Sequence, residues 1–132
     1  MAFNGNFLCT SFKVELMKGV HNFTAASNVF KIALYTNSAT FTAATTAYTA
    51  TNEVSGTNYT AGGNFLTSVT PVAISTTALT DFADEVFSTV TISAVRGALI
   101  YNAPASGDPT VCVLDFGADK AASSGDFTIV FP

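Results

Sequence analysis

The chain has 132 residues and a mass of 13.7 kDa, which is the size of one domain. Its five Lys and Arg residues are dispersed and its net charge is −4, so it has no basic cluster for nucleic acid or anionic membranes. No apolar run approaches the roughly 20 residues that span a bilayer, and we expect no signal peptide. Only 11% of the residues are charged, against about 25% in average domains, which favours a subunit that buries its surface against neighbours.

The N-terminal part predicts an extended segment followed by a short helix. Residues 1–10 either form an arm that reaches a neighbouring subunit or add a first strand to the domain. A helix is predicted over 11–19, with Ser11 as its N-cap and Gly19 at its end. The prediction rests on apolar residues that recur at helical spacing: Phe12, Leu16, Met17, Val20 and Phe23.

Strand patterns follow from residue 29 onwards. Residues 29–36 alternate between apolar and other side chains and predict a strand. The Thr- and Ala-rich residues 37–51 are expected to form a loop with at most one helical turn. Three glycines within 52–63 predict a tight, ordered loop with positive φ angles.

The second half predicts several more strands. Residues 66–75 form a strand pattern in which Pro71 indicates an edge position or a bulge. Further strands are expected at 86–95, 98–102, 110–116 and 127–131, with a break at Arg96–Gly97 and a polar loop over 117–125. The whole chain, residues 1–132, is therefore predicted to be a single mainly β domain, an antiparallel sandwich or barrel-like fold with one short N-terminal helix.

A search for catalytic and metal-binding residues finds no convincing set. The only histidine, His21, has no metal-ligand spacing, and pairing it with Cys9 as a nucleophile is a generic possibility; a role at the helix end is the better interpretation. Asp81, Asp84 and Glu85 could share a cation, but their spacing does not match a calcium loop, and a solvated loop is favoured. No catalytic, cofactor or metal residues are predicted, and we expect no enzyme.

Three other features have structural interpretations. The glycine loop lacks the Lys-Ser/Thr pair of a phosphate-binding loop, so its glycines are expected to serve its conformation. The triplet Asp115–Gly117 resembles the kinase metal-binding triplet but has none of its accompanying motifs. Cys112 lies in an apolar run and is expected to be a buried thiol, with a bridge to Cys9 as the less favoured alternative.

The chain carries 12 Phe and four Tyr, more aromatic residues than a small core is certain to hold. Those in arm or loop segments are candidates for contacts between subunits, and the equal alternative is that they cover the ends of the domain's own core. The candidates are Phe3, Phe7, Tyr48 and Tyr59.

Five segments, in the same order, resemble a family of small tailed-bacteriophage virion proteins. The resemblance covers the chain from about residue 13 to the end, and Asn58 stands where the family often has glycine, which implies a left-handed asparagine. The segments are 18–23 (KGVHNF), 30–36 (FKIALYT), 52–63 (NEVSGTNYTAGG), 96–102 (RGALIYN) and 113–117 (VLDFG).

The resemblance implies a structural role on a virion assembled in the host cytoplasm and no catalytic residues or cofactors. A capsid decoration (cement) protein is expected, which binds the major capsid protein as a homo-oligomer, with a trimer as the expected state. A tail, neck or fibre component is the alternative. A carbohydrate-binding module or hydrolase would need exposed aromatic residues beside paired carboxylates.

Overall fold

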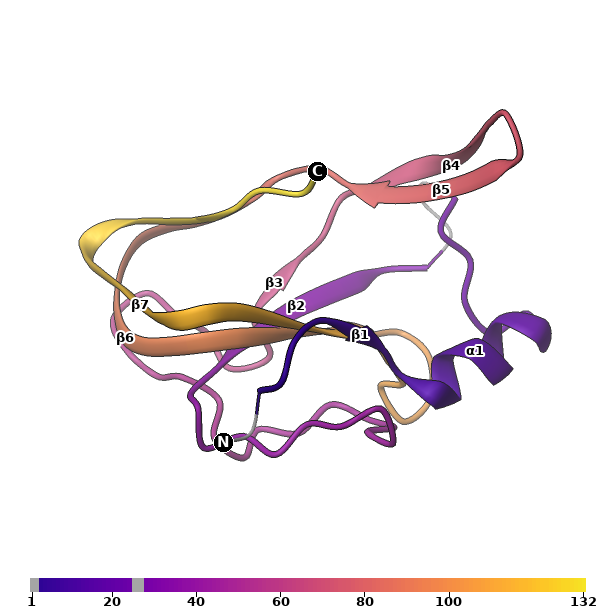
Figure 1. The fold of residues 1–132 in the computed structure, drawn as a ribbon. Coiled ribbons are helices and arrows are strands. Elements are labelled where there is room, and N and C mark those ends of the chain that lie inside the picture. Colours follow the sequence, from indigo (N-terminus) through magenta and orange to yellow (C-terminus); the bar gives the residue numbers. More distant parts are fainter. Residues whose placement is uncertain (1–2, 25–27) are drawn as a thin grey trace.

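The structure, a computed structural model, describes residues 3–24 and 28–132. It is mainly β with antiparallel sheets and one short helix near the N-terminus, which confirms the predicted fold class; the sheets form a sandwich-like domain and do not close into a barrel (Figure 1). The elements are β1 (Phe7–Leu8), α1 (Thr10–Met17), β2 (Phe30–Tyr35), β3 (Asn64–Phe65), β4 (Ser68–Ile74), β5 (Thr77–Phe82), β6 (Glu85–Asn102) and β7 (Thr110–Ile129).

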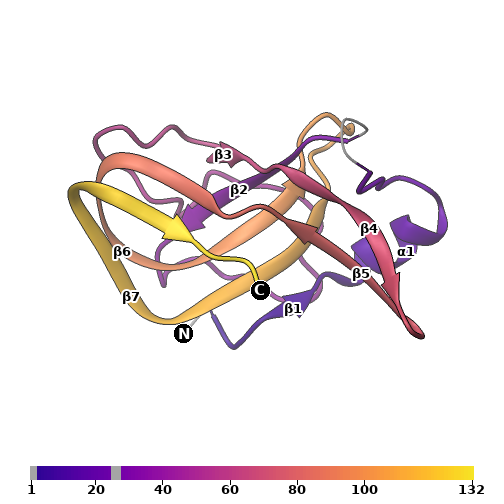
Figure 2. The same ribbon diagram turned by 90° about the horizontal axis from the view of Figure 1, so that it is seen from above.

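Two long strands, β6 and β7, form the frame of the domain. They pair with each other along most of their length, and β1, β2 and β3 complete a five-stranded sheet in the order β1-β7-β6-β2-β3. Both strands curve from the lower layer of the domain to the upper one, as Figures 1 and 2 show. Their register shifts repeatedly between Phe87 and Gly97, and Thr89 and Ala94 take positive φ there. Bulges of this kind bend a strand pair and let one hairpin serve two layers.

Two predicted interruptions are wrong because pairing continues through them. Arg96–Gly97 lies inside β6, and residues 117–125 lie inside β7. Gly97 allows close packing here, since a Cβ at this position would overlap the Leu114 carbonyl oxygen and the ring of Phe3. The polar residues of 117–125 are mostly exposed on the bent part of β7, where strand pairing satisfies the backbone and water satisfies the side chains.

The helix lies close to its predicted position, but its N-terminus differs. Cys9 occupies the N-cap position without a side-chain hydrogen bond, so the prediction of Ser11 as the cap is wrong. The end at Gly19 is confirmed: Gly19 has φ 73°, and its N–H donates to the Leu16 carbonyl. The Val20 N–H reaches the Glu15 carbonyl, which completes a Schellman motif.

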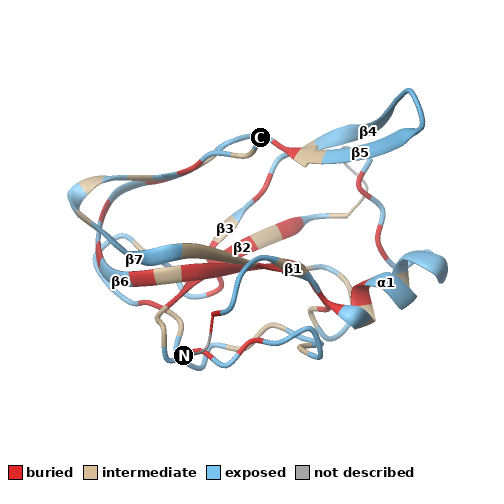
Figure 3. Ribbon diagram, in the orientation of Figure 1, coloured by how far each residue is buried: buried red, intermediate tan, exposed pale blue. Residues whose placement is uncertain are grey.

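The core lies between the two layers and around β2. Five of the six β2 residues are buried, so the predicted strand at 29–36 is confirmed but is covered on both faces. Figure 3 shows the buried residues gathered in β2 and in the second half of β6. Residues 37–51 form a loop without a helical turn. Within 3–24 and 28–132, no helix is long and apolar enough to cross a membrane.

Candidate functional site

The predicted acidic patch is divided among separate hydrogen bonds. Asp81 accepts from the Phe82 N–H, Asp84 from the Phe131 N–H at 2.9 Å, and Glu85 from the Asn64 side-chain amide at 2.8 Å. Asp81 belongs to β5 and Glu85 begins β6, so the expected solvated loop is reduced to the two residues between the strands. In the part of the chain that the structure describes, no three His, Cys, Asp or Glu side chains are grouped to hold a metal ion.

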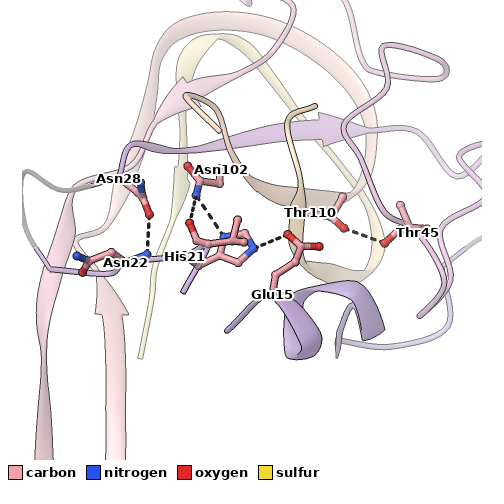
Figure 4. Close-up of polar contacts among 8 residues, drawn as sticks. Glu15, His21, Asn22, Asn28, Thr45, Asn102 and Thr110 are labelled. Carbon is pink, nitrogen blue, oxygen red and sulfur yellow. Dashed lines mark hydrogen bonds and ion pairs between the residues drawn. The ribbon is translucent and has the colours of Figure 1, made fainter. Parts of the chain in front are cut away.

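His21 is buried between α1 and the sheet (Figure 4). Its Nε2 lies 2.9 Å from Glu15 Oε2, and its Nδ1 lies 3.3 Å from the Asn102 amide nitrogen. A neutral ring with its proton on Nε2 satisfies both contacts, since it donates to Glu15 and accepts from Asn102. The expectation that His21 satisfies carbonyls at the helix end is therefore wrong. Its role is to tie α1 to the end of β6.

Neither cysteine is arranged as a nucleophile. Both Cys9 and Cys112 are free thiols. Burial raises the pKa of the Cys9 thiol and raises that of Cys112 to about 12, so both stay protonated near neutral pH. Cys9 and Cys112 thus behave as packing residues.

The glycine loop has the strained conformation that its composition predicts. Asn58 has φ 63°, which confirms the left-handed asparagine, and Gly62 and Gly63 have φ 94° and 73°. A Cβ on Gly63 would overlap the Ile32 carbonyl oxygen, so the loop lies directly against β2. Only glycine satisfies both requirements at this position.

A carboxylate inside the loop holds it to the sheet. Glu53 accepts hydrogen bonds from the Tyr48 hydroxyl (2.7 Å), the Tyr59 hydroxyl (2.6 Å) and the Gly62 N–H (2.8 Å). The Tyr101 hydroxyl donates to the Gly62 carbonyl at 2.7 Å. Burial raises the pKa of the Tyr59 and Tyr48 phenols, and the adjacent Glu53 raises both further. We call these five residues the Glu53 cluster.

The four aromatic interface candidates therefore pack against their own domain. Phe3 is fully buried, which leaves it no surface for a neighbour, and Phe7 pairs with β7 opposite Val113. Tyr48 and Tyr59 belong to the Glu53 cluster and are partly buried against the core. These positions favour the alternative in which the aromatics cover the chain's own core. For Phe7, Tyr48 and Tyr59 an interface role stays a prediction.

The N-terminal segment is held as a first strand rather than extended as an arm, as far as it is described; residues 1 and 2 of the predicted arm lie outside the described residues. Asp115 accepts a hydrogen bond from the Gly5 N–H at 3.0 Å, and Asn6 accepts one from the Asp115 N–H. The hydrogen bond from the Gly117 N–H, then that from Gly5, lowers the pKa of Asp115. The triplet at 115–117 thus has a structural role.

The β4–β5 hairpin projects from the body of the domain (Figures 1 and 2). Pro71 lies in a bulge between Val69 and Val72, as predicted, whereas β5 was not expected from the sequence. Phe82, at the base of β5, is buried, so strand alternation places Ala78 and Thr80 on its inward side.

The opposite side of the hairpin carries its large apolar residues. Residues paired across the two strands share a face, and the register pairs Leu79 with Val72 and Thr77 with Ile74. The four large apolar residues of this side are between 42% and 61% exposed. Small residues face inward and large apolar residues face outward, which reverses the usual pattern of a two-layer domain. We call this surface the outer hairpin face; it consists of Val69, Val72, Ile74 and Leu79.

A groove of about 740 Å³ separates the inward side of the hairpin from α1, β1 and β7. Its lining is almost entirely apolar, and Asp81 is the only charged residue among the lining residues. Met17, 83% exposed at the end of α1, adds another apolar residue at this end of the molecule. The other walls include Leu8, Leu16, Cys112, Leu114 and Phe131, and Leu79 on β5 also reaches the groove.

The sequence contains a feature that indicates this surface. The interface prediction, which considered only aromatic residues, did not take it into account. Residues 66–80 (LTSVTPVAISTTALT) contain no charged residue and no histidine. An exposed hairpin usually carries charges that keep it from associating, and Lys is common at such edges. Fifteen uncharged residues around a proline-marked strand could have indicated an exposed contact surface.

The fold and the surface together define a mainly β, sandwich-like domain that presents an apolar hairpin to its surroundings. Comparison of the chain with protein-family models, with curated proteins and with solved structures finds no match.

Proposed function

We propose that the protein is a structural component of a tailed-bacteriophage particle, a head decoration (cement) protein that stabilises the shell by bridging major capsid proteins. The observation that carries the proposal is the outer hairpin face, four exposed apolar side chains on an uncharged segment. The resemblance of five sequence segments to small phage virion proteins is the reason for proposing a phage particle.

Contact area is the means by which such a protein would act. Burying a fully exposed Val, Leu or Ile contributes about 1.5–3 kcal/mol, so four half-exposed side chains offer roughly 3–6 kcal/mol before the costs of association. A shell under internal pressure fails where capsomers separate, and each added interface raises the free energy of separation. Binding only to the expanded shell would favour that state by mass action.

The rest of the domain suits a passive scaffold. The Glu53 cluster pairs its hydroxyls and carboxylate internally, and His21 is held between Glu15 and Asn102. Side-chain hydrogen bonds between separate segments, as in both groups, favour one conformation of the domain. A rigid body that carries an apolar projection needs no chemical step to bind.

A tail, neck or fibre position is the second candidate, and copy number separates it from the first. Quantitative mass spectrometry of purified virions would measure copies per particle. Hundreds of copies support decoration of the head, whereas about six or twelve, the numbers of tail and neck symmetry, would exclude it and favour the alternative. Absence from purified particles would overturn both.

A binding experiment tests the outer hairpin face itself. Val72→Asp places a charge in that face and should weaken binding to shells that lack the protein by at least tenfold. Val86→Asp is the matched control, because Val86 is 40% exposed and lies outside the hairpin. Equal binding by both variants and the unmodified protein would remove the hairpin from the proposal.

A further inference from the structure

The free edge of β5 has no strand partner among the described residues. β4 and β5 form a two-stranded sheet of their own, and β5 pairs only with β4. Two-stranded hairpins are marginally stable in water, and an unpaired edge presents backbone N–H and C=O groups to any strand that can align with it. The outward side of β5 is therefore a template for an additional strand.

The two edges of the hairpin differ in how they are protected. The β4 edge has Pro71, which lacks an N–H group, and a bulge between Val69 and Val72. Both features hinder pairing with a further strand. β5 has neither feature and no Lys or Arg, and its one charged residue, Asp81, lies next to the base of the hairpin. The chain thus blocks one edge and leaves the other open.

We propose that the β5 edge pairs with the β5 edge of a second copy of this chain, antiparallel about a two-fold axis, to form a four-stranded sheet. A two-fold contact brings the same surface of each copy together. With the axis at Leu79, the Leu79 residues of the two copies lie opposite each other and Asp81 of one copy lies opposite Thr77 of the other, so the two carboxylates stay apart. The segment 66–80 has no charges with which to form ion pairs to a charged partner strand. When it meets the same segment of a second copy, no like charges repel each other.

The pairing also accounts for the apolar character of this end of the molecule. It makes the outer hairpin faces of two copies continuous and brings the second β5 beside the open groove, whose lining is apolar. The eight large side chains of the combined face then present on the order of 500 Å² of apolar surface, comparable to the largest functional patches on soluble proteins. The inference goes beyond the proposed function and does not depend on a phage setting.

The oligomeric state of the purified protein tests this pairing. Light scattering coupled to size-exclusion chromatography should give twice the 13.7 kDa of the chain, or a higher even multiple. Leu79→Lys puts a charge on β5 near the axis, and we expect it to lower the mass to that of the monomer. Leu79 is 42% exposed, so the variant should fold, which circular dichroism would check.

Val72→Lys is the matched control. Val72 lies directly opposite Leu79 on the same face of the hairpin, but on the strand away from the proposed contact. We expect this variant to keep the mass of the unmodified protein, and β5 amides to exchange at least tenfold faster in Leu79→Lys than in Val72→Lys. A monomeric or trimeric unmodified protein, or loss of the dimer in both variants, would overturn the edge pairing. The proposed function would remain, because it is tested by copies per particle.

Discussion

The Glu53 cluster and the β4–β5 hairpin are opposite solutions to the placement of side chains at the surface of one small domain. In the cluster, a carboxylate and two phenols that water could solvate are turned inward and hydrogen-bonded to one another. In the hairpin, aliphatic side chains that the core could hold are turned outward. The polar groups of the cluster form their hydrogen bonds within the chain's own fold, whereas the apolar side chains of the hairpin stay exposed to a partner.

The comparison teaches where to look for a contact surface on a small domain. A buried polar group with all its partners contributes to one conformation. An exposed apolar group without a partner contributes little to folding and much to association. The aromatic residues that first suggest an interface pack against the domain's own core, and the exposed aliphatic residues lie on the hairpin that we propose as a contact surface.

The largest effect is expected from Gly63→Ala, at the closest approach of the glycine loop to β2. The new Cβ would overlap the Ile32 carbonyl oxygen and would require φ 73° of a residue with a side chain. We expect a loss of at least about 4 kcal/mol in the free energy of unfolding, or no folded protein. The control Gly107→Ala has φ 84° but open space around it, so it should cost only about 1–2 kcal/mol. Equal losses in urea denaturation would contradict the close contact.

Glu53→Ala should have the next largest effect, because it removes the acceptor of three hydrogen bonds from partly buried donors. We expect a loss of about 2–4 kcal/mol in the free energy of unfolding, less than the sum of three separate bonds since water can replace some of them. Asp119→Ala, whose side chain is 55% exposed and lies 4.0 Å from Arg96, should change stability by less than about 0.5 kcal/mol. A loss below 1 kcal/mol in Glu53→Ala would mean that the cluster does not hold the loop.

Alkaline titration should show the tyrosines as one cooperative group. Burial raises the pKa of all four phenols above the ordinary value of 10.0, that of Tyr101 to about 12, and the charge of Glu53 contributes to each shift. A raised pKa means that the folded state holds the proton more tightly, so this stability is complete below pH 10 and is lost as the pH rises through the folded-state values. Phenolate absorbance near 295 nm should therefore appear together with unfolding.

The control for this titration is the protein unfolded in urea, whose tyrosines should ionise near the ordinary value. The chain contains no Trp, so the phenolate signal is unobscured. Ionisation of one or more tyrosines near pH 10 with an intact circular dichroism spectrum would show that the cluster is open to water.

The smallest effect should come from Ile74→Ala on the outer hairpin face. Ile74 is 61% exposed, so removing its side chain should change the free energy of unfolding by less than about 0.5 kcal/mol in dilute protein. The same substitution at the fully buried Ile32 should cost about 2–5 kcal/mol. A loss above 1 kcal/mol in the free energy of unfolding of Ile74→Ala at low concentration would show that the hairpin face supports the fold itself. The hairpin would then not differ from the Glu53 cluster in this respect.

Local signals account for the parts of the fold that the sequence predicted well. Gly19 ends α1 because glycine adopts positive φ freely, and Pro71 marks a bulge because proline has no N–H to pair, while the left-handed asparagine at position 58 is what the resemblance implied. Interruptions were predicted at Arg96–Gly97 and at 117–125 for the same local reason, and there the prediction failed. Pairing between β6 and β7 carries both strands through those residues, since bulges absorb the local irregularities.

The candidate site was harder to predict than the fold. Nothing local distinguishes β5, where Thr and Ala give a weak alternation, and the stacking of Tyr48 on Tyr101 depends on residues 53 positions apart. The interaction of His21 with Glu15 and Asn102 likewise joins three parts of the chain that only folding brings together.

By itself the sequence determined the β-rich class, the scarcity of charge and the uncharged segment at 66–80, because composition and periodicity are properties of the chain before it folds. Only the tertiary structure decided which apolar residues remain outside the core. The space inside the domain is finite, and Phe3 and the buried residues of β2 and β6 help to fill it. Val72, Ile74 and Leu79 are as apolar as many residues of that core, and they lie on the surface because the hairpin that carries them extends beyond it.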